Sequence, residues 1–249
     1  MQFNFDNLNL DLGANILEVE VPAELEQTFS TGLDFIDDAF GGKGMTPSTA
    51  CLFTGTPGAG KTTLMMQLAN AITRSGNLAL FNTAEESLFQ VRKVAKRLNL
   101  RHGFVAGSER LVDKVIDNAD KIRNLKENKG KQLFIIVDSL QTLDDGKYAN
   151  GTINSMTQVR CLEQLCQYAK DTYAIVIVIG QVTKNGDLAG KQVLKHMIDA
   201  HCHLFVDQDT KSDSYGERIF EVQKNRFGCA GIMYELSMTG KGFKEKIFS

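Results

Sequence analysis

The chain has 249 residues, of which 43% are hydrophobic and 23% are charged, and its formal net charge is -2. This composition is typical of a folded domain and excludes disordered and collagen-like chains. The cysteines form no CxxC pair, which excludes a four-thiolate zinc module and a secreted disulfide framework. The sequence has no apolar stretch of membrane-spanning length and no signal-peptide pattern, so we predict a cytoplasmic protein without membrane contact.

Charge is distributed unevenly along the chain. Residues 1–50 contain nine acidic residues and one base, Lys43, whereas bases are in excess over the remainder. A mildly basic body is compatible with polyanion binding, and it is equally typical of an ordinary surface. Because no Ser/Gly-rich linker divides the chain, we predict an acidic N-terminal arm over residues 1–24 and a single domain over residues 25–249.

Strands and helices alternate along most of the chain. Short apolar runs predict strands at 50–54, 78–82, 133–137 and 173–179. Apolar residues at helical spacing predict helices at 61–75, 86–98, 109–125 and 157–170. Three further strands, with no helix between them, are predicted at 201–206, 218–222 and 232–238. We therefore predict an α/β fold whose mostly parallel sheet is flanked by helices and has an antiparallel C-terminal extension.

The strongest motif is GTPGAGKT at 55–62, which fits the phosphate-loop pattern GxxxxGK[ST] between a predicted strand and a predicted helix. Its glycines allow backbone N–H groups to face phosphate oxygens, and the helix that follows adds its positive N-terminal dipole. We expect Lys61 to reach the β- and γ-phosphates of ATP and the Thr62 hydroxyl to bind Mg²⁺. The predicted nucleotide contacts are Gly55, Thr56, Pro57, Gly58, Ala59, Gly60, Lys61, Thr62 and Thr63.

Polar residues follow three other predicted strands. Asp138 ends the apolar run LFIIVD, where it is expected to complete the metal site. Glu85 and Glu86 follow the second predicted strand, where a carboxylate can orient the attacking water. We favour Glu85, but spacing alone leaves Glu86 open, and one of the two could be a charge at a helix N-terminus. Gln181 follows the fourth predicted strand and is a candidate sensor of the γ-phosphate.

Several stretches, in chain order, resemble the bacterial RadA (Sms) family of DNA-repair ATPases. They are STGLDFIDDAFGGKGMTPS at 30–48, EES at 85–87, VDSLQT at 137–142, VTKNGDLAGKQVLKHMID at 182–199 and KNRFG at 224–228. The resemblance covers residues 25–245 and implies a RecA-like P-loop NTPase core. Family members also have an N-terminal zinc module with four cysteines and a C-terminal domain resembling the Lon protease fold, and these residues contain neither pattern.

The resemblance implies an ATP-driven motor that assembles as a ring, usually hexameric, and acts on single-stranded DNA in recombination, repair or branch migration. A recombinase or a replication protein is the kind of partner that it implies. On the matching positions, Glu85 becomes the catalytic glutamate, and Lys224 and Arg226 contact the ATP of a neighbouring subunit. Two cations two residues apart on a strand share a face, which suits this role, but two surface charges on an edge strand would give the same pattern. Gln181 stands where the family tends to have His.

The loop that follows Gln181 is the first candidate for DNA contact. It contains Lys184, Lys191 and Lys195, whose charges suit sequence-independent contact with phosphates. Lys191 replaces a proline that the family has at this position. A second candidate is the segment 144–155, in which Tyr148 could stack on a base.

One other interpretation of the function remains open. A regulatory ATPase resembling KaiC would act on a protein partner instead of DNA, and ATP-dependent assembly without stimulation by DNA would favour it.

Four residues near the C-terminal strands suggest a metal site at first sight: His196, His201, Cys202 and His203. Alternation along a strand places His201 and His203 on one face and Cys202 on the other, so we expect partly buried strand residues and no closed zinc site.

Overall fold

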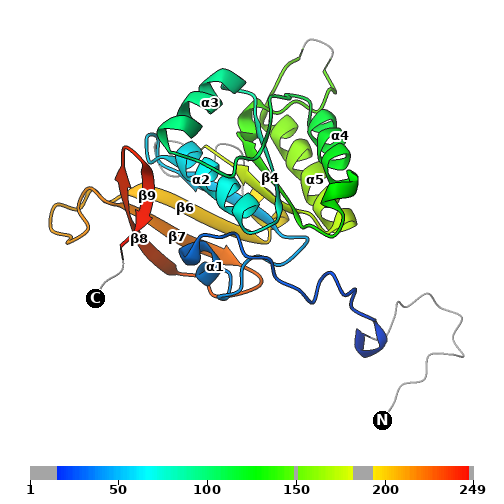
Figure 1. Cartoon of the computed structure of the whole chain (residues 1–249), viewed down its shortest axis with the longest axis horizontal. Helices are drawn as coiled ribbons and strands as arrows, with labels where there is room; N and C mark the ends of the chain where they lie inside the picture. The colour runs from blue at the N-terminus through cyan, green and yellow to red at the C-terminus, as the bar shows by residue number, and fades with distance from the viewer. Residues whose placement is uncertain (1–15, 149–150, 182–192, 247–249) are drawn as a thin grey trace, which may run out of the picture.

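The computed structural model describes residues 16–148, 151–181 and 193–246, and one twisted sheet organises them (Figure 1). The strand order is β3-β2-β4-β5-β1-β6-β7-β8-β9. The strands are β1 Ala50–Gly55, β2 Leu78–Thr83, β3 Val105–Gly107, β4 Leu133–Asp138, β5 Ile175–Ile179, β6 Ala200–Val206, β7 Arg218–Asn225, β8 Ile232–Thr239 and β9 Gly242–Glu245. Pairing is parallel from β3 through β6 and antiparallel from β6 to β9. This confirms the predicted parallel sheet with an antiparallel extension.

Helices cover both faces of the parallel part of the sheet, as Figure 1 shows. They are α1 Asp34–Ala39, α2 Lys61–Arg74, α3 Leu88–Arg97, α4 Val112–Arg123, α5 Ser155–Thr172 and α6 Val193–Met197. One buried cluster joins α1, α2 and α3 to the sheet, and a second joins α4, α5 and α6 to the opposite face. Because side chains alternate along a strand, Cys51 and Phe53 of β1 enter the first cluster and Ala50 and Leu52 the second.

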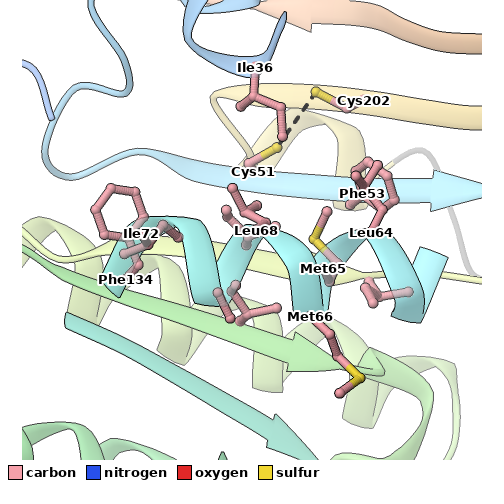
Figure 2. Close-up of a cluster of buried hydrophobic side chains, with 14 of the residues drawn as sticks. Ile36, Cys51, Phe53, Leu64, Met65, Met66, Leu68, Ile72, Phe134 and Cys202 are labelled. Atoms are coloured by element: carbon pink, nitrogen blue, oxygen red, sulfur yellow. Dashed lines mark hydrogen bonds between the residues drawn. The ribbon is translucent and has the colours of Figure 1, made fainter. Parts of the chain in front are cut away.

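Helix α2, which follows the phosphate loop, packs its buried face against the sheet (Figure 2). Leu64, Leu68 and Ile72 recur at helical spacing and are fully buried, and Phe53 of β1 is 2% exposed. Cys51 and Cys202 lie on neighbouring strands in the same cluster, with their Sγ atoms 4.0 Å apart, and both are free thiols. A close-packed apolar layer therefore fixes the start of α2 relative to the end of β1.

Most predicted elements are confirmed, and the boundaries that differ have identifiable causes. Helix α3 begins at Leu88, later than predicted, because Ser87 and Gln90 form a reciprocal capping box. Strand β5 begins after Tyr173, which ends α5 in the left-handed conformation with φ of 59°. The short α-helices and β-strands that the sequence pattern did not predict are α1, β3, α6 and β9.

The described part of the predicted acidic arm leads away from the sheet in Figure 1. It contains one 3-10 turn, Ile16–Glu18, and the side chains of residues 17–24 are exposed. Within the described residues, no helix has both the length and the apolar character needed to cross a membrane.

Candidate functional site

The phosphate loop connects β1 to α2 at the carboxyl edge of the parallel sheet. Gly60 has φ of +104°, and a Cβ on it would lie 2.7 Å from the Phe243 ring of β9. A Cβ on Gly55 would lie 2.3 Å from the carbonyl oxygen of Leu204 in β6. Both positions therefore require glycine, one because of its backbone conformation and both because of close approach.

Lys61 is the first residue of α2, and its ammonium group folds back over the loop. Its Nζ donates hydrogen bonds to the carbonyl oxygens of Gly55 at 2.8 Å and Thr56 at 3.2 Å. Burial holds the pKa of Lys61 below its ordinary value, while the nearby carboxylates of Asp138 and Glu85 act in the opposite direction. The ammonium is thus placed where a phosphate group bound to the loop would meet a positive charge.

Thr62 and Asp138 form the second part of the site. The Thr62 hydroxyl donates a 2.6 Å hydrogen bond to Oδ2 of Asp138, at the end of β4. Burial raises the pKa of Asp138 to about 6; the hydrogen bond from Thr62 acts against this shift, and Glu85 and Glu86 add to it. The site thus combines a hydroxyl, a buried carboxylate and further carboxylates with a single lysine. These oxygen donors fit Mg²⁺, because a divalent cation would offset the excess negative charge.

Glu85 lines the same cleft. Its Oε1 accepts a 2.8 Å hydrogen bond from the hydroxyl of Ser139, the residue after Asp138. Glu86 differs, because its Oε2 is buried and has no hydrogen-bond partner among the described residues. The cleft has a volume of about 310 Å³ and is lined by Gly55, Pro57, Lys61, Thr62, Glu85, Asp138, Ser139, Ile179 and Gln181. The geometry therefore favours Glu85 over Glu86. Ser139 was not predicted, although its place next to Asp138 could have indicated it.

Lys224 and Arg226 lie at the end of the sheet where the parallel strands begin, opposite the end that carries the phosphate loop. Because β6 runs parallel to β1 and pairs its first residue, Ala200, with Asn225 of β7, the end of β7 is at the edge away from the phosphate loop. Strand β7 ends at Asn225, so Lys224 lies within the strand and Arg226 directly follows it. Neither cation can reach the phosphate loop of its own chain.

Both cations instead contact the junction of α6 and β6. Lys224 Nζ donates to the carbonyl oxygens of Lys195 at 2.8 Å and Ile198 at 2.6 Å. Arg226 Nη1 lies 3.2 Å from Oδ1 of Asp199. The ammonium of Lys224 is therefore engaged by backbone, whereas the side chain of Arg226 stays 55% exposed.

A family model for the KaiC ATPase matches residues 29–238 of the chain. The chain belongs to this family of ATPases. It is also 35% identical over 228 residues to the DNA repair protein RadA of Haemophilus influenzae, an alignment that covers 91% of this chain and 46% of that protein. For RadA of Aquifex aeolicus the identity is 32% over 217 residues, covering 87% and 46%. The resemblance to the RadA core is thus confirmed, and the chain spans less than half the length of these relatives.

Solved structures with the same fold include a replicative helicase. A DnaB-like replicative helicase, solved to describe its interactions with primase, superposes with a TM-score of 0.73 at 16% identity, covering 87% of this chain and 61% of that one. A second solved structure, of an ATPase domain, gives a TM-score of 0.72 at 16% identity, covering 87% and 90%. These similarities confirm the RecA-like fold of this KaiC-family chain.

The candidate DNA-contacting residues are only partly described. Lys184 and Lys191 lie outside the described residues, whereas Lys195 is exposed on α6. In the other candidate loop, the Arg160 guanidinium lies 5.7 Å from the centre of the Tyr148 ring and is paired with Asp145. The Tyr148 ring, 37% exposed, thus has a cation stacked on it.

The histidines of β6 contact a threonine of β1. Thr54 Oγ1 lies 2.8 Å from His201 Nε2 and 2.8 Å from His203 Nδ1, which confirms that the two histidines share a face. Burial lowers the pKa of His201 to about 4, and Lys195, His203 and Lys224 add to the shift. Both histidines are thus partners of a strand hydroxyl beside the phosphate loop.

Proposed function

We propose that this chain is an ATP-hydrolysing motor of the RecA/RadA type that acts on single-stranded DNA in recombination, repair or branch migration in the cytoplasm. Its ATP sites would lie at the subunit interfaces of a ring, with the hexamer that the family resemblance implies as the arrangement to test. One observation carries the proposal. The groups needed to bind and hydrolyse ATP meet in one cleft, while Lys224 and Arg226 lie at the opposite edge, where only another subunit's nucleotide is within reach.

Each residue of the cleft has a distinct task in this proposal. The loop amides and Lys61 bind the phosphates of ATP, and Lys61 leaves the carbonyls of Gly55 and Thr56 to do so. Thr62 and Asp138 would hold Mg²⁺, which when bound neutralises charge on the phosphates. The carboxylate of Glu85 orients the attacking water and accepts its proton, and Ser139 fixes that carboxylate through its hydrogen bond.

The remaining predicted residues link hydrolysis to movement. Gln181 lines the cleft and directly precedes the segment that carries the candidate DNA-binding lysines, so loss of the γ-phosphate would be sensed at the start of that segment. Arg226 would contact the phosphates of the neighbouring subunit, where a guanidinium stabilises developing negative charge. Lys224 would support this contact through its bonds to the α6–β6 junction. The relatives named DNA repair protein support DNA as the polymer. The family resemblance adds a recombinase or a replication protein as the expected kind of partner.

ATP turnover at fixed salt, with and without single-stranded DNA, tests the proposal. We expect turnover to rise on addition of DNA and to disappear in Glu85→Gln in both conditions. Neutralising Lys195 together with Lys184 and Lys191 should weaken DNA binding and reduce its dependence on salt. Turnover that DNA leaves unchanged would contradict the motor.

A second candidate is a regulatory ATPase that acts on a protein. The match to the KaiC family model supports it, because that match covers the same core. This candidate predicts ATP-dependent assembly with no response to DNA, so the experiment above separates the two.

A further inference from the structure

Asp199 contacts both Ala50 and Arg226 through its side chain and its backbone. Its Oδ2 accepts a 3.0 Å hydrogen bond from the backbone N–H of Ala50, and its Oδ1 accepts one of 3.2 Å from Arg226 Nη1. Two backbone bonds complete the set: Asp199 N donates to Ala50 O, and Arg226 N donates to Asp199 O. Asp199 is 7% exposed. A carboxylate so deeply buried needs a compensating partner, and Arg226 forms its ion pair.

The Arg226 guanidinium keeps donor capacity for a second anion. A guanidinium carries five N–H donors in a fixed plane, and the contact with Asp199 is made through Nη1. More than half of the side chain is exposed, so the donors not facing Asp199 are available to an approaching phosphate. The neighbouring cation is different, because the Lys224 ammonium already contacts two carbonyl oxygens.

We propose that Asp199 is the positioning residue of Arg226, holding the guanidinium in the orientation in which it meets the ATP phosphates of the neighbouring subunit. This inference rests on the proposed function. A long, half-exposed arginine has many rotamers, and a contact that fixes one of them lowers the entropy lost when the transition state is reached. Asp199 acts through Arg226 and does not itself contact ATP.

The second carboxylate oxygen of Asp199, Oδ2, connects the Asp199–Arg226 ion pair to strand β1. Ala50 is the first residue of β1, and Gly55 at the far end of β1 begins the phosphate loop. An extended run of this length spans about 17 Å. Asp199 therefore orients Arg226 relative to the same strand that carries its own chain's phosphate loop.

Asp199→Asn separates the two contacts of the carboxylate. The amide oxygen can still accept from the Ala50 N–H, while the amide nitrogen faces the guanidinium and cannot accept from it. We expect kcat to fall about tenfold with the KM for ATP unchanged, and Arg226→Ala to lower kcat by about a thousandfold. Combining the two substitutions should give the kcat of Arg226→Ala alone, since Asp199 has nothing left to position. Asp117→Asn, in the exposed ion pair with Lys114, is the matched control and should leave kcat unchanged.

Mixed assemblies supply a second measurement. A Lys61→Ala subunit lacks a working phosphate loop but has an intact Arg226, so it should restore turnover to an adjacent Asp199→Asn subunit. Misfolding, or damage confined to the variant's own site, would give no such recovery.

The outcomes distinguish this inference from the proposed function. Full turnover in Arg226→Ala would overturn the action of Arg226 on a neighbouring ATP. Loss in Arg226→Ala with full turnover in Asp199→Asn would overturn the positioning role alone. The positioning role is also overturned if Asp199→Asn lowers kcat further in the Arg226→Ala background, or if mixed assemblies show no recovery.

Discussion

The hydroxyl of Thr62 at the start of α2 donates a 2.6 Å hydrogen bond to the carboxylate of Asp138 at the end of β4. The two residues are far apart in the sequence, and packing of α2 on the sheet brings them together. In this arrangement burial raises the pKa of Asp138 to about 6, and the charges of Glu85 and Glu86 add to the effect. The site thus concentrates negative charge that a bound cation would relieve.

Asp138→Asn should make the nucleotide-free protein more stable while it abolishes ATP hydrolysis. A carboxyl group whose folded pKa lies above its unfolded value destabilises the fold when both states are ionised, so the gain is full above about pH 6 and vanishes below about pH 4. We expect a gain of roughly 1–3 kcal/mol in the free energy of unfolding at pH 8. Urea denaturation at pH 8 and pH 4 measures it, with Asp117→Asn as the control. A loss of stability at pH 8 would contradict the charge argument.

Glu85→Gln should retain ATP binding and lose turnover by at least about a hundredfold, because an amide cannot accept the proton of water. The side chain keeps its length and can still accept the hydrogen bond from Ser139. Glu86→Gln is the matched control, one residue away, and should keep most of its turnover. Nucleotide titration and steady-state kinetics on both variants separate the two glutamates, and the reverse pattern would identify Glu86 as the base.

Lys61→Ala should weaken ATP binding by at least about tenfold and remove hydrolysis, because the ammonium is the positive side chain that lines the described cleft. Titration with a fluorescent ATP analogue gives the affinity directly. The fold should persist, since the hydrogen bonds of the ammonium in the described part of the chain go to loop carbonyls. Wild-type affinity would contradict the assignment of this loop to phosphate binding.

The buried His201 should make the protein sensitive to mild acid. Its folded pKa of about 4 lies below the ordinary value of 6.5, so the unfolded chain takes up a proton first and stability falls as pH drops from about 6.5 towards 4. Between pH 7.5 and pH 5.5, wild type should lose about 1 kcal/mol more than His201→Gln. Urea denaturation at both pH values measures the difference, and the exposed His102→Gln provides a control that should behave like wild type.

The sequence predicted those parts of the structure that depend on local pattern. The β1–loop–α2 unit followed from apolar periodicity and a motif with fixed spacing, and Asp138 followed from its place at the end of an apolar strand. The contacts of Lys224 could not be predicted in this way, because they depend on how β6 and β7 pair across an intervening loop. Strand β9 was not predicted because four residues carry too little periodicity, although its Phe243 packs against Gly60 of the phosphate loop.

Strand β1 connects two functional features: the phosphate loop follows Gly55 at one end, and the Asp199 carboxylate binds the N–H of Ala50 at the other. Its six residues pair with β5 on one side and β6 on the other, an arrangement suited to transmit a displacement from one end of the strand to the other. In the proposed ring, each β1 strand would connect the ATP site of its own subunit to the arginine that reaches the next ATP site. In that proposed ring, nucleotide binding at one site would then change the alignment of the arginine that the subunit offers to the next site.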